Sequence, residues 1–258
     1  MKFKNILFIL FSISYVFSPK AVSGQGYKIK TIVIDAGHGG IKPGAAGKYS
    51  LEKNVALKVA LKLGKALNEE LPSIRIIQTR KTDVDVDWYR RAEIANEAKA
   101  DLFISIHCNS MPGKDRTTRG TETFVGAYRR INEMDAGLKE NEEILTDKNY
   151  NKKASYDPTD PEELIMLSLY KSLYRTKSLA LAKLIQKNYT EVNKRVNRGV
   201  KEQGLLILQR AALPSVLTEI GFISNPAEED YINSESGQEE IVNAIVNAIK
   251  QYKKEVEN

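Results

Sequence analysis

The run LFISIH at Leu102–His107 is the stretch of this sequence that decides the fold class. Two similar runs, TIVID at Thr31–Asp35 and SVLTE at Ser215–Glu219, are also rich in large and β-branched apolar residues. Strands that are apolar along most of their length are covered on both faces, which is typical of parallel sheets. By the same criteria we predict further strands at Ile74–Gln78, Thr121–Val125 and Leu205–Leu208.

Helical patterns separate these strands. Within Leu51–Leu67, the apolar residues Val55, Val59 and Leu63 recur every four positions and therefore share one face of a helix. Because strands alternate with helices, the sequence predicts a single α/β domain over residues 28–256. Its sheet should be mainly parallel and twisted, with helices covering both faces. The other predicted helices span Tyr89–Ala98, Lys177–Val192 and Glu239–Tyr252.

The composition is that of an ordinary globular protein. Of 258 residues, 42% are hydrophobic and 28% are charged, which argues against a disordered, collagen-like or fibrous chain. The single cysteine, Cys108, excludes a disulfide within the chain and a metal knuckle of the CxxC type. Since Cys108 ends an apolar strand, we expect it to be a buried free thiol.

The first 24 residues have the features of a secretory signal peptide. Residues 1–5 are basic, an apolar run of 12 residues follows at Ile6–Phe17, and the small-residue stretch AVSG lies at 21–24. A helix that spans a bilayer needs about 20 residues, so this run is too short, although an uncleaved anchor is the alternative. We expect a periplasmic or secreted protein with no stable membrane insertion after cleavage.

The net charge of +6 is concentrated in that segment. Lys2, Lys4 and Lys20 lie in the first 24 residues, which hold no acid, so the rest of the chain has a net charge of +3. A surplus this small does not predict nucleic acid as a partner.

Both histidines of the chain follow predicted strands. His38 comes after the strand at 31–35, and His107 ends the strand at 102–107. Ligands collect at the carboxyl ends of parallel strands, so both imidazoles should point into one crevice. Glu52, in the first turn of the next helix, could supply a third metal ligand, and Glu219 ends another strand. Each acid taken alone would fit a surface or helix-start role.

Four blocks of sequence resemble the zinc-dependent N-acetylmuramoyl-L-alanine amidases, in the order in which that family has them. The resemblance covers about residues 30 to 252, outside an insertion described below. Lys42, where the family often has an acid, and Cys108, where it often has a small residue, depart from the pattern. The matching blocks are Asp35–Gly40 with Pro43–Ala45 and Glu52-Lys53; Thr79-Arg80 with Arg91 and Asn96; Ala100–Asn109; and Pro214–Pro226.

The resemblance implies that His38, Glu52 and His107 bind Zn²⁺ and that Glu219 is the catalytic glutamate. Two imidazoles and one carboxylate leave an open position for water on the metal. Glu219 would accept a proton from that water and pass it to the leaving amide nitrogen. Gly39 and Gly40 are expected to let the backbone approach the metal. The implied substrate is peptidoglycan, cut between N-acetylmuramic acid and L-alanine during cell-wall remodelling or daughter-cell separation.

Three further residues are candidates around this site. Asp35 could orient a metal ligand from behind, or it could have a structural role at the end of its strand. Arg91 and Asn109 could contact substrate, but their residue types favour anchoring loops, as do Arg80 and Asn96.

A segment at about 129–176 is longer and more polar than a connection between a strand and a helix needs. It contains a charged helical pattern at Glu133–Leu145 and a second predicted helix at 161–174, so we expect a helical insertion on the domain. The insertion follows the strand that begins at Thr121, and we expect the end of that strand to lie near the crevice of His107.

Some relatives in the family have a helical insertion here that blocks the zinc until a partner protein moves it. Glu140, between Ala136 and Ile144 on a partly apolar helix face, could take the open zinc position, and Lys139–Asn141 resembles the corresponding stretch of those relatives. A protein activator would then act on the insertion. The alternative is a solvated acidic helix.

Two other functions stay open on the sequence. Another zinc peptidase could act on wall peptides, although the HExxH motif of one such class is absent. A non-catalytic peptidoglycan-binding module is the second alternative, but such a module has no use for Glu219 beside an open zinc site.

Overall fold

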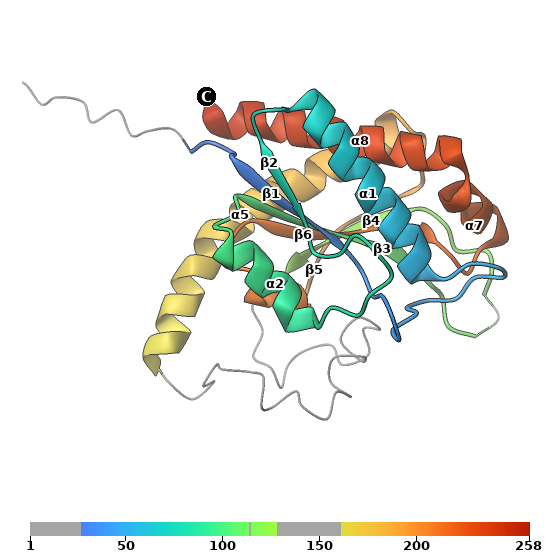
Figure 1. Ribbon diagram of the computed structural model, residues 1–258, viewed down its shortest axis with the longest axis horizontal. Coiled ribbons are helices and arrows are strands. Elements are labelled where there is room, and N and C mark those ends of the chain that lie inside the picture. The colour runs from blue at the N-terminus through green and yellow to red at the C-terminus, as the bar shows by residue number, and fades with distance from the viewer. Residues whose placement is uncertain (1–26, 114, 128–160) are drawn as a thin grey trace, which may run out of the picture.

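The computed structural model describes residues 27–113, 115–127 and 161–258, and shows a six-stranded sheet between two layers of helices (Figure 1). The strand order is β2-β1-β3-β6-β4-β5. Neighbouring strands run parallel except for β4 and β6, which are antiparallel. The strands are β1 (Thr31–Ala36), β2 (Arg75–Gln78), β3 (Leu102–Asn109), β4 (Thr121–Gly126), β5 (Asn197–Gln203) and β6 (Ser215–Phe222).

Helices cover both faces of the sheet, which confirms the predicted α/β class. Helix α8 contacts both α1 and α5, and these three pack on one face, whereas α2 and α6 contact each other on the opposite face (Figure 1). The helices are α1 (Glu52–Glu70), α2 (Trp88–Glu97), α5 (Pro161–Glu191), α6 (Leu206–Arg210), α7 (Pro226–Asn233) and α8 (Glu235–Glu257). Throughout the described ranges, every helix is too short or too polar to span a bilayer.

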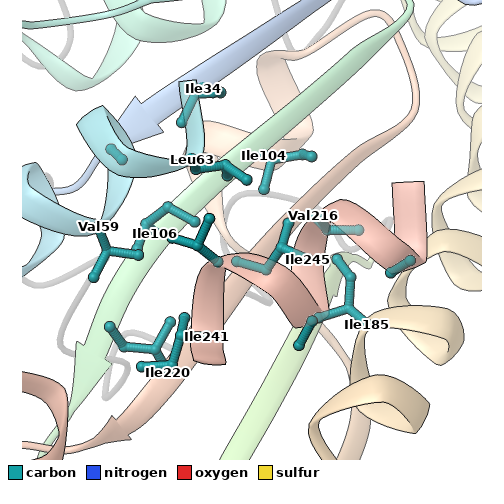
Figure 2. Close-up of a cluster of buried hydrophobic side chains, with 14 of the residues drawn as sticks. Ile34, Val59, Leu63, Ile104, Ile106, Ile185, Val216, Ile220, Ile241 and Ile245 are labelled. Carbon is teal, nitrogen blue, oxygen red and sulfur yellow. The ribbon is translucent and has the colours of Figure 1, made fainter. Parts of the chain in front are cut away.

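The larger core lies between the sheet and α1, α5 and α8 (Figure 2). The apolar residues spaced four apart on α1, among them Val59 and Leu63, are fully buried there, and so are Ile241 and Ile245 of α8. Full burial of one such side chain contributes about 1.5–3 kcal/mol to the free energy of folding. The periodicity in the sequence therefore identifies the correct helix faces.

The alternation of side chains along the strands determines which residues can reach the functional site. Ile104 and Ile106 of β3 enter the larger core, whereas Phe103 of β3 and Leu217 of β6 enter the smaller core beneath α2 and α6. Side chains two positions apart share a face. Asp35, His107 and Glu219 therefore lie on the α2 and α6 face of the sheet, toward the carboxyl ends of their strands.

The prediction of a strand at Leu205–Leu208 is wrong. These residues enter the short helix α6, and the strand at this point of the chain is β5, at Asn197–Gln203. Leu205, Ile207 and Leu208 are buried in the smaller core around this helical turn. β5 is an edge strand with half-buried and exposed side chains, so its sequence NRGVKEQ lacks an apolar run.

The segment around 161–192 also differs from its prediction. The helices expected at 161–174 and 177–192 form one continuous helix, α5. Residues 174–177 contain neither glycine nor proline, so nothing in the sequence ends the helix there. The predicted signal peptide, the pattern at Glu133–Leu145 and Glu140 lie outside the described residues.

The expectation that the strand beginning at Thr121 ends near His107 is wrong as well. β4 runs antiparallel to β6, with Glu122 paired with Glu219 and Phe124 paired with Leu217. The end of β4 therefore lies at the opposite edge of the sheet from the carboxyl ends of β3 and β6. Residues 110–120, which join β3 to β4, are too few for the helical crossover that a parallel strand would need.

Candidate metal centre

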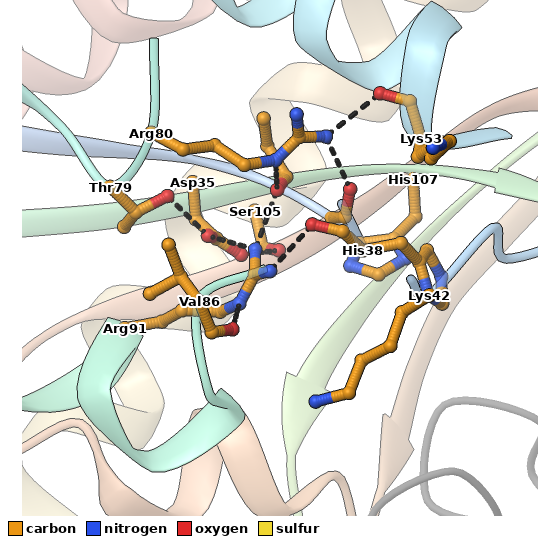
Figure 3. A network of polar contacts seen from close by, with 12 residues as sticks. Asp35, His38, Lys42, Lys53, Thr79, Arg80, Val86, Arg91, Ser105 and His107 are labelled. Atoms are coloured by element: carbon orange, nitrogen blue, oxygen red, sulfur yellow. Dashed lines mark hydrogen bonds and ion pairs between the residues drawn. The ribbon is translucent and has the colours of Figure 1, made fainter. Parts of the chain in front are cut away.

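Three side chains from three different elements meet at the carboxyl ends of β1 and β3. His38 follows β1, Glu52 is the first residue of α1, and His107 lies near the end of β3. One ligand atom from each lies within 4.8 Å of the others, and all three residues are buried. Glu52 Oε1 is 3.2 Å from His38 Nε2 and 2.9 Å from His107 Nδ1. Figure 3 shows the two imidazoles side by side.

The carboxylate of Glu52 is held in place by backbone groups as well. The amide of Ala45 donates to Oε2 at 2.7 Å, and the amide of Cys108 donates to Oε1 at 3.0 Å. Burial raises the pKa of Glu52, but the charge of His38 and the hydrogen bonds with both histidines lower it more, so that the net pKa is well below its ordinary value. Glu52 is therefore present as the carboxylate, the form that ligates metal.

Cys108 lies beside this cluster in sequence but does not join it. The strand alternation places its side chain in the larger core, where it is 1% exposed. Burial and then the charges of Glu52 and Glu219 raise the pKa of the thiol well above its ordinary value. This confirms the prediction of a buried free thiol, and it leaves two nitrogens and one carboxylate as the donor set.

Two glycines make room for the three side chains. A Cβ atom on Gly37 would lie 2.4 Å from Cε1 of His107, and one on Gly44 would lie 2.5 Å from Oε2 of Glu52. A Cβ atom on Gly39 or Gly40 would collide with the loop at 80–85, so these two glycines let the His38 loop pack against that loop. The glycines whose Cβ would meet the ligand side chains are Gly37 and Gly44.

Arg80 and Arg91 hold the backbone around His38 (Figure 3). Nη2 of Arg80 donates to the carbonyl oxygens of Gly37 and Lys53, each at 2.8 Å, which links the His38 loop to the start of α1. Both arginines also donate to the carbonyl oxygen of Ala36. They are buried anchors of the loop, in agreement with the predicted role for these residues.

In the described part of the chain, Asp35 bonds to Thr79, Ser105 and Arg91 and to none of the three proposed ligand side chains. It accepts hydrogen bonds from Thr79 Oγ1, Ser105 Oγ and Arg91 Nη1, at 2.6, 2.6 and 2.8 Å. Burial raises the pKa of Asp35, but the charge of Arg91 and the two hydroxyl groups lower it more, to a net value below the ordinary one. Asp35 thus acts on the His38 loop through Arg91.

Glu219 lies next to the cluster in the sheet. Its Cα is the direct partner of His107 across β3 and β6, so both side chains leave the same face, and Glu219 is 1% exposed. Within the described ranges it is not among the three residues that approach one another closely enough to share a metal ion. A buried acid beside the cluster is suited to accept a proton.

A further buried acid, Glu122, was not predicted from the sequence; it is the direct partner of Glu219 across β6 and β4. Arg198 and Lys201 of β5 form ion pairs with Glu122. Asn109 Nδ2 lies 3.4 Å from Glu122 Oε2, so Asn109 joins these residues and not the ligands. An acid inside the predicted strand at Thr121–Val125 was the only signal in the sequence.

Comparisons with known proteins identify the family. A family model described as N-acetylmuramoyl-L-alanine amidase matches residues 32–251. The amidase AmiA of Escherichia coli K12 is 32% identical over 239 residues, which are 91% of this chain and 79% of AmiA.

Solved structures support the same family. An N-acetylmuramoyl-L-alanine amidase from Clostridium difficile 630 superposes with a TM-score of 0.65 at 26% identity, over 88% of this chain and 97% of that one. The CwlD amidase from Clostridioides difficile, solved in complex with the GerS lipoprotein, superposes with a TM-score of 0.62 at 27% identity, over 86% and 98% of the two chains. The chain described here therefore belongs to the N-acetylmuramoyl-L-alanine amidase family.

Proposed function

We propose that this protein is a Zn²⁺-dependent amidase that hydrolyses the bond between the lactyl group of N-acetylmuramic acid and the L-alanine of the stem peptide. Its role is in cell-wall remodelling or daughter-cell separation. The observation that supports this function best is the buried cluster of His38, Glu52 and His107 with Glu219 beside it.

The donor set fits zinc. Two imidazole nitrogens and one carboxylate oxygen make up a common protein ligand set of catalytic zinc sites, and they leave one position for water or substrate. The fit extends to the surroundings, because Gly37 and Gly44 leave the ligand side chains the room that any Cβ would fill. Arg91 fixes the carbonyl of His38 and thereby the ligand loop.

Glu219 performs the proton transfers in this mechanism. Zinc bound at the cluster would supply a Lewis acid for the scissile carbonyl and lower the pKa of the attacking water. Glu219 accepts the proton of that water and delivers it to the amide nitrogen as the bond to L-alanine breaks. Its burial on the same face as His107 keeps the carboxylate close to the reacting atoms.

Elemental analysis of the purified protein, together with product masses from digested sacculi, tests this function. We expect one zinc per chain and a free lactyl carboxylate on the glycan. His38→Ala and His107→Ala should lose both metal and activity, whereas Glu219→Gln should keep zinc and lose about 10²-fold or more in rate.

Each alternative predicts a different result. Cuts inside the stem peptide would indicate a zinc peptidase, and a zinc-loaded protein without turnover would indicate a binding module. Stoichiometric zinc in the His38→Ala, His107→Ala double variant would remove these histidines from the site. Near-normal turnover of Glu219→Gln would remove Glu219 from the mechanism.

We further propose that residues 1–24 are a cleaved signal peptide and that residues 28–256 form the catalytic domain of a periplasmic or secreted enzyme. The basic, apolar and small-residue order of the first 24 residues supports this. N-terminal sequencing of the protein from the producing cell should give a start near Gly24. A retained Met1 in the membrane fraction would contradict it.

The insertion at about 129–176 is proposed as a regulatory element, with Glu140 as an inhibitory zinc ligand and a protein activator that displaces it. The complex of CwlD with a lipoprotein supports a partner for this kind of domain. β4 leads away from the cluster, so Glu140 would have to bridge the length of this six-residue strand, about 20 Å, to reach the metal. The segment from Ala127 to Glu140 spans about 20 Å as a helix and about twice that when extended, so Glu140 can reach.

Two variants test the regulatory role. Glu140→Ala, and a deletion of 131–175 bridged by a short linker, should both raise basal activity. An unchanged or lower rate in a folded, zinc-loaded Glu140→Ala protein would exclude the blocking role of this residue.

A further inference from the structure

A row of polar side chains crosses the sheet from the metal cluster to its edge. His107 of β3 is the Cα partner of Glu219 of β6, and Glu219 is the partner of Glu122 of β4. Arg198 and Lys201 of the edge strand β5 then contact Glu122. Because cross-strand partners leave the same face of a sheet, the row is continuous on the face that holds the proposed active site.

Arg198 has a fixed side chain whose two terminal amino groups are unused by the described residues. Its Nε donates to Glu122 Oε1 at 2.6 Å, and its guanidinium carbon lies 5.0 Å from the ring centroid of Phe222. Nη1 and Nη2 make no hydrogen bond to any residue that the structure describes. The side chain is 35% exposed. These two amino groups form the planar fork that binds a carboxylate through two parallel hydrogen bonds.

Lys201 leaves this end of the row positively charged. Its Nζ lies 2.9 Å from Glu122 Oε2, and its side chain is 40% exposed. Glu122 is 2% exposed and can compensate only one of the two cations. A ligand with a negative charge would compensate the second cation.

The local backbone directs Arg198 toward the row. The β4–β5 register shifts between the Thr121–Asn197 pair and the Thr123–Val200 pair, so β5 has an extra residue opposite Glu122. Gly199, with φ of +91°, sits in this bulge. Bulges re-aim a side chain and are common beside active sites. The bulge in β5 therefore sets the direction of the Arg198 side chain.

We propose that Arg198, assisted by Lys201, binds a free carboxylate of the stem peptide, so that the peptide lies along the row from Glu219 toward β5. This inference rests on the proposed function, in which the amide bond is cut at the metal cluster. Strands lie about 4.8 Å apart, so β5 is about 10 Å from β6. An extended peptide advances about 3.3 Å per residue, which brings a carboxylate two to three residues beyond the cut amide to the fork.

The test compares two soluble muramyl peptides, one with free stem carboxylates and one with the same carboxylates converted to amides. We expect the wild type to have a higher kcat/KM on the free acid by about tenfold or more, mainly through KM. Arg198→Gln should bring the ratio close to one by losing activity on the acid alone. Arg198→Lys keeps the charge beside Glu122 but lacks the fork, so it should lose most of the preference while its Tm stays near that of the wild type.

Arg175→Gln is the matched control. Arg175 binds Glu202 through two hydrogen bonds and is 43% exposed, but Glu202 is the partner of Val125, whose side chain enters the core on the opposite face. This variant should keep the wild-type ratio. If Arg198→Gln and Arg198→Lys keep that ratio too, or lose activity equally on both peptides, Arg198 has only a structural role and the proposal is wrong.

A binding measurement separates this inference from the proposed function. In the zinc-loaded Glu219→Gln protein, calorimetry should show tighter binding of the free-acid peptide than of the amide, and adding Arg198→Gln should abolish the difference. Equal affinity for both peptides would overturn the inference whatever the wild type cleaves. If the wild type cleaves neither peptide while the binding difference persists, the proposed reaction is wrong and the carboxylate site stands.

Discussion

The Nη2 atom of Arg91 donates to the backbone carbonyl oxygen of His38 at 2.6 Å. His38 has a φ of +56°, a left-handed conformation that costs energy for any residue with a Cβ atom. Such a conformation persists only where its surroundings hold it, and the Arg91 fork is one of the groups that do so. The position of the His38 imidazole therefore depends on a residue in α2, far along the chain.

Replacing Arg91 with lysine should weaken the binding of zinc. A lysine keeps a positive charge near Asp35 but cannot reach Val86, Ala36 and His38 at once, as the guanidinium does. Loss of such outer contacts lowers metal affinity by about 10- to 100-fold, which competition with a chelator would measure. Arg90→Lys is the control, since Arg90 is exposed and pairs with Glu97. Equal zinc affinity in Arg91→Lys and the wild type would show that the loop keeps its shape unaided.

Adding a single methyl group at Gly37 should weaken the binding of zinc. The new Cβ would lie 2.4 Å from the His107 ring, so the ring or the backbone has to move. We expect Gly37→Ala to fold but to bind zinc at least about tenfold more weakly by the same chelator assay. Gly113→Ala introduces strain at a φ of +71°, but its Cβ meets open space, so it should leave zinc affinity unchanged. Normal zinc binding by Gly37→Ala would mean that the three ligands can rearrange freely.

Much of the fold follows from the sequence because the buried strands are nearly pure apolar runs. Phe103, Ile104 and Ile106 are completely buried, and hydrophobic burial alone is enough to specify such a central strand. His38 and His107 could be placed together for a related reason, since parallel strands bring their carboxyl ends to one edge. At these strands and histidines, the pattern along the sequence and the position in the fold lead to the same conclusion.

The parts that could not be predicted depend on partners that no local pattern contains. β5 can have charged residues because it is an edge strand. The apolar run at Leu205–Leu208 packs beneath α2 as the start of a short helix, and a run of four apolar residues does not distinguish a helical turn from a strand. Glu122 in a buried strand is explained only by Arg198 and Lys201, some 76 and 79 positions away. Those ion pairs form only when β4 is inserted between β6 and β5.

Removing the charge of Asp35 should destabilise the protein at neutral pH. Asp35→Asn leaves Arg91 buried without its ionic partner, and the loss of one member of a buried pair costs about 3–5 kcal/mol in the free energy of unfolding. The folded-state pKa of Asp35 lies below its ordinary value of 3.8, so its contribution is complete above about pH 4 and disappears as the pH falls through the folded-state pKa.

Urea unfolding at several pH values measures the contribution of the Asp35 charge to the free energy of unfolding. The difference in free energy between the wild type and Asp35→Asn should be largest at pH 6–7 and should shrink below about pH 3.8. Asp230→Asn, on an exposed position of α7, should cost less than about 1 kcal/mol. A difference that stays constant down to pH 2 would show that the charge of Asp35 does not stabilise the fold.

The thiol of Cys108 should be inert in the native protein. It is 1% exposed, and its raised pKa keeps it protonated, whereas the thiolate is the form that reacts. Reaction with an alkylating reagent then requires opening of the larger core, at a cost of several kcal/mol, so labelling at pH 8 should be at least about a thousandfold slower than in urea. Cys108→Ala should keep zinc, because the sulfur lies on the opposite face of β3 from His107. Rapid labelling of the folded protein, or loss of zinc in Cys108→Ala, would contradict the alternation of side chains that places His107 and Glu219 on the face of the proposed active site.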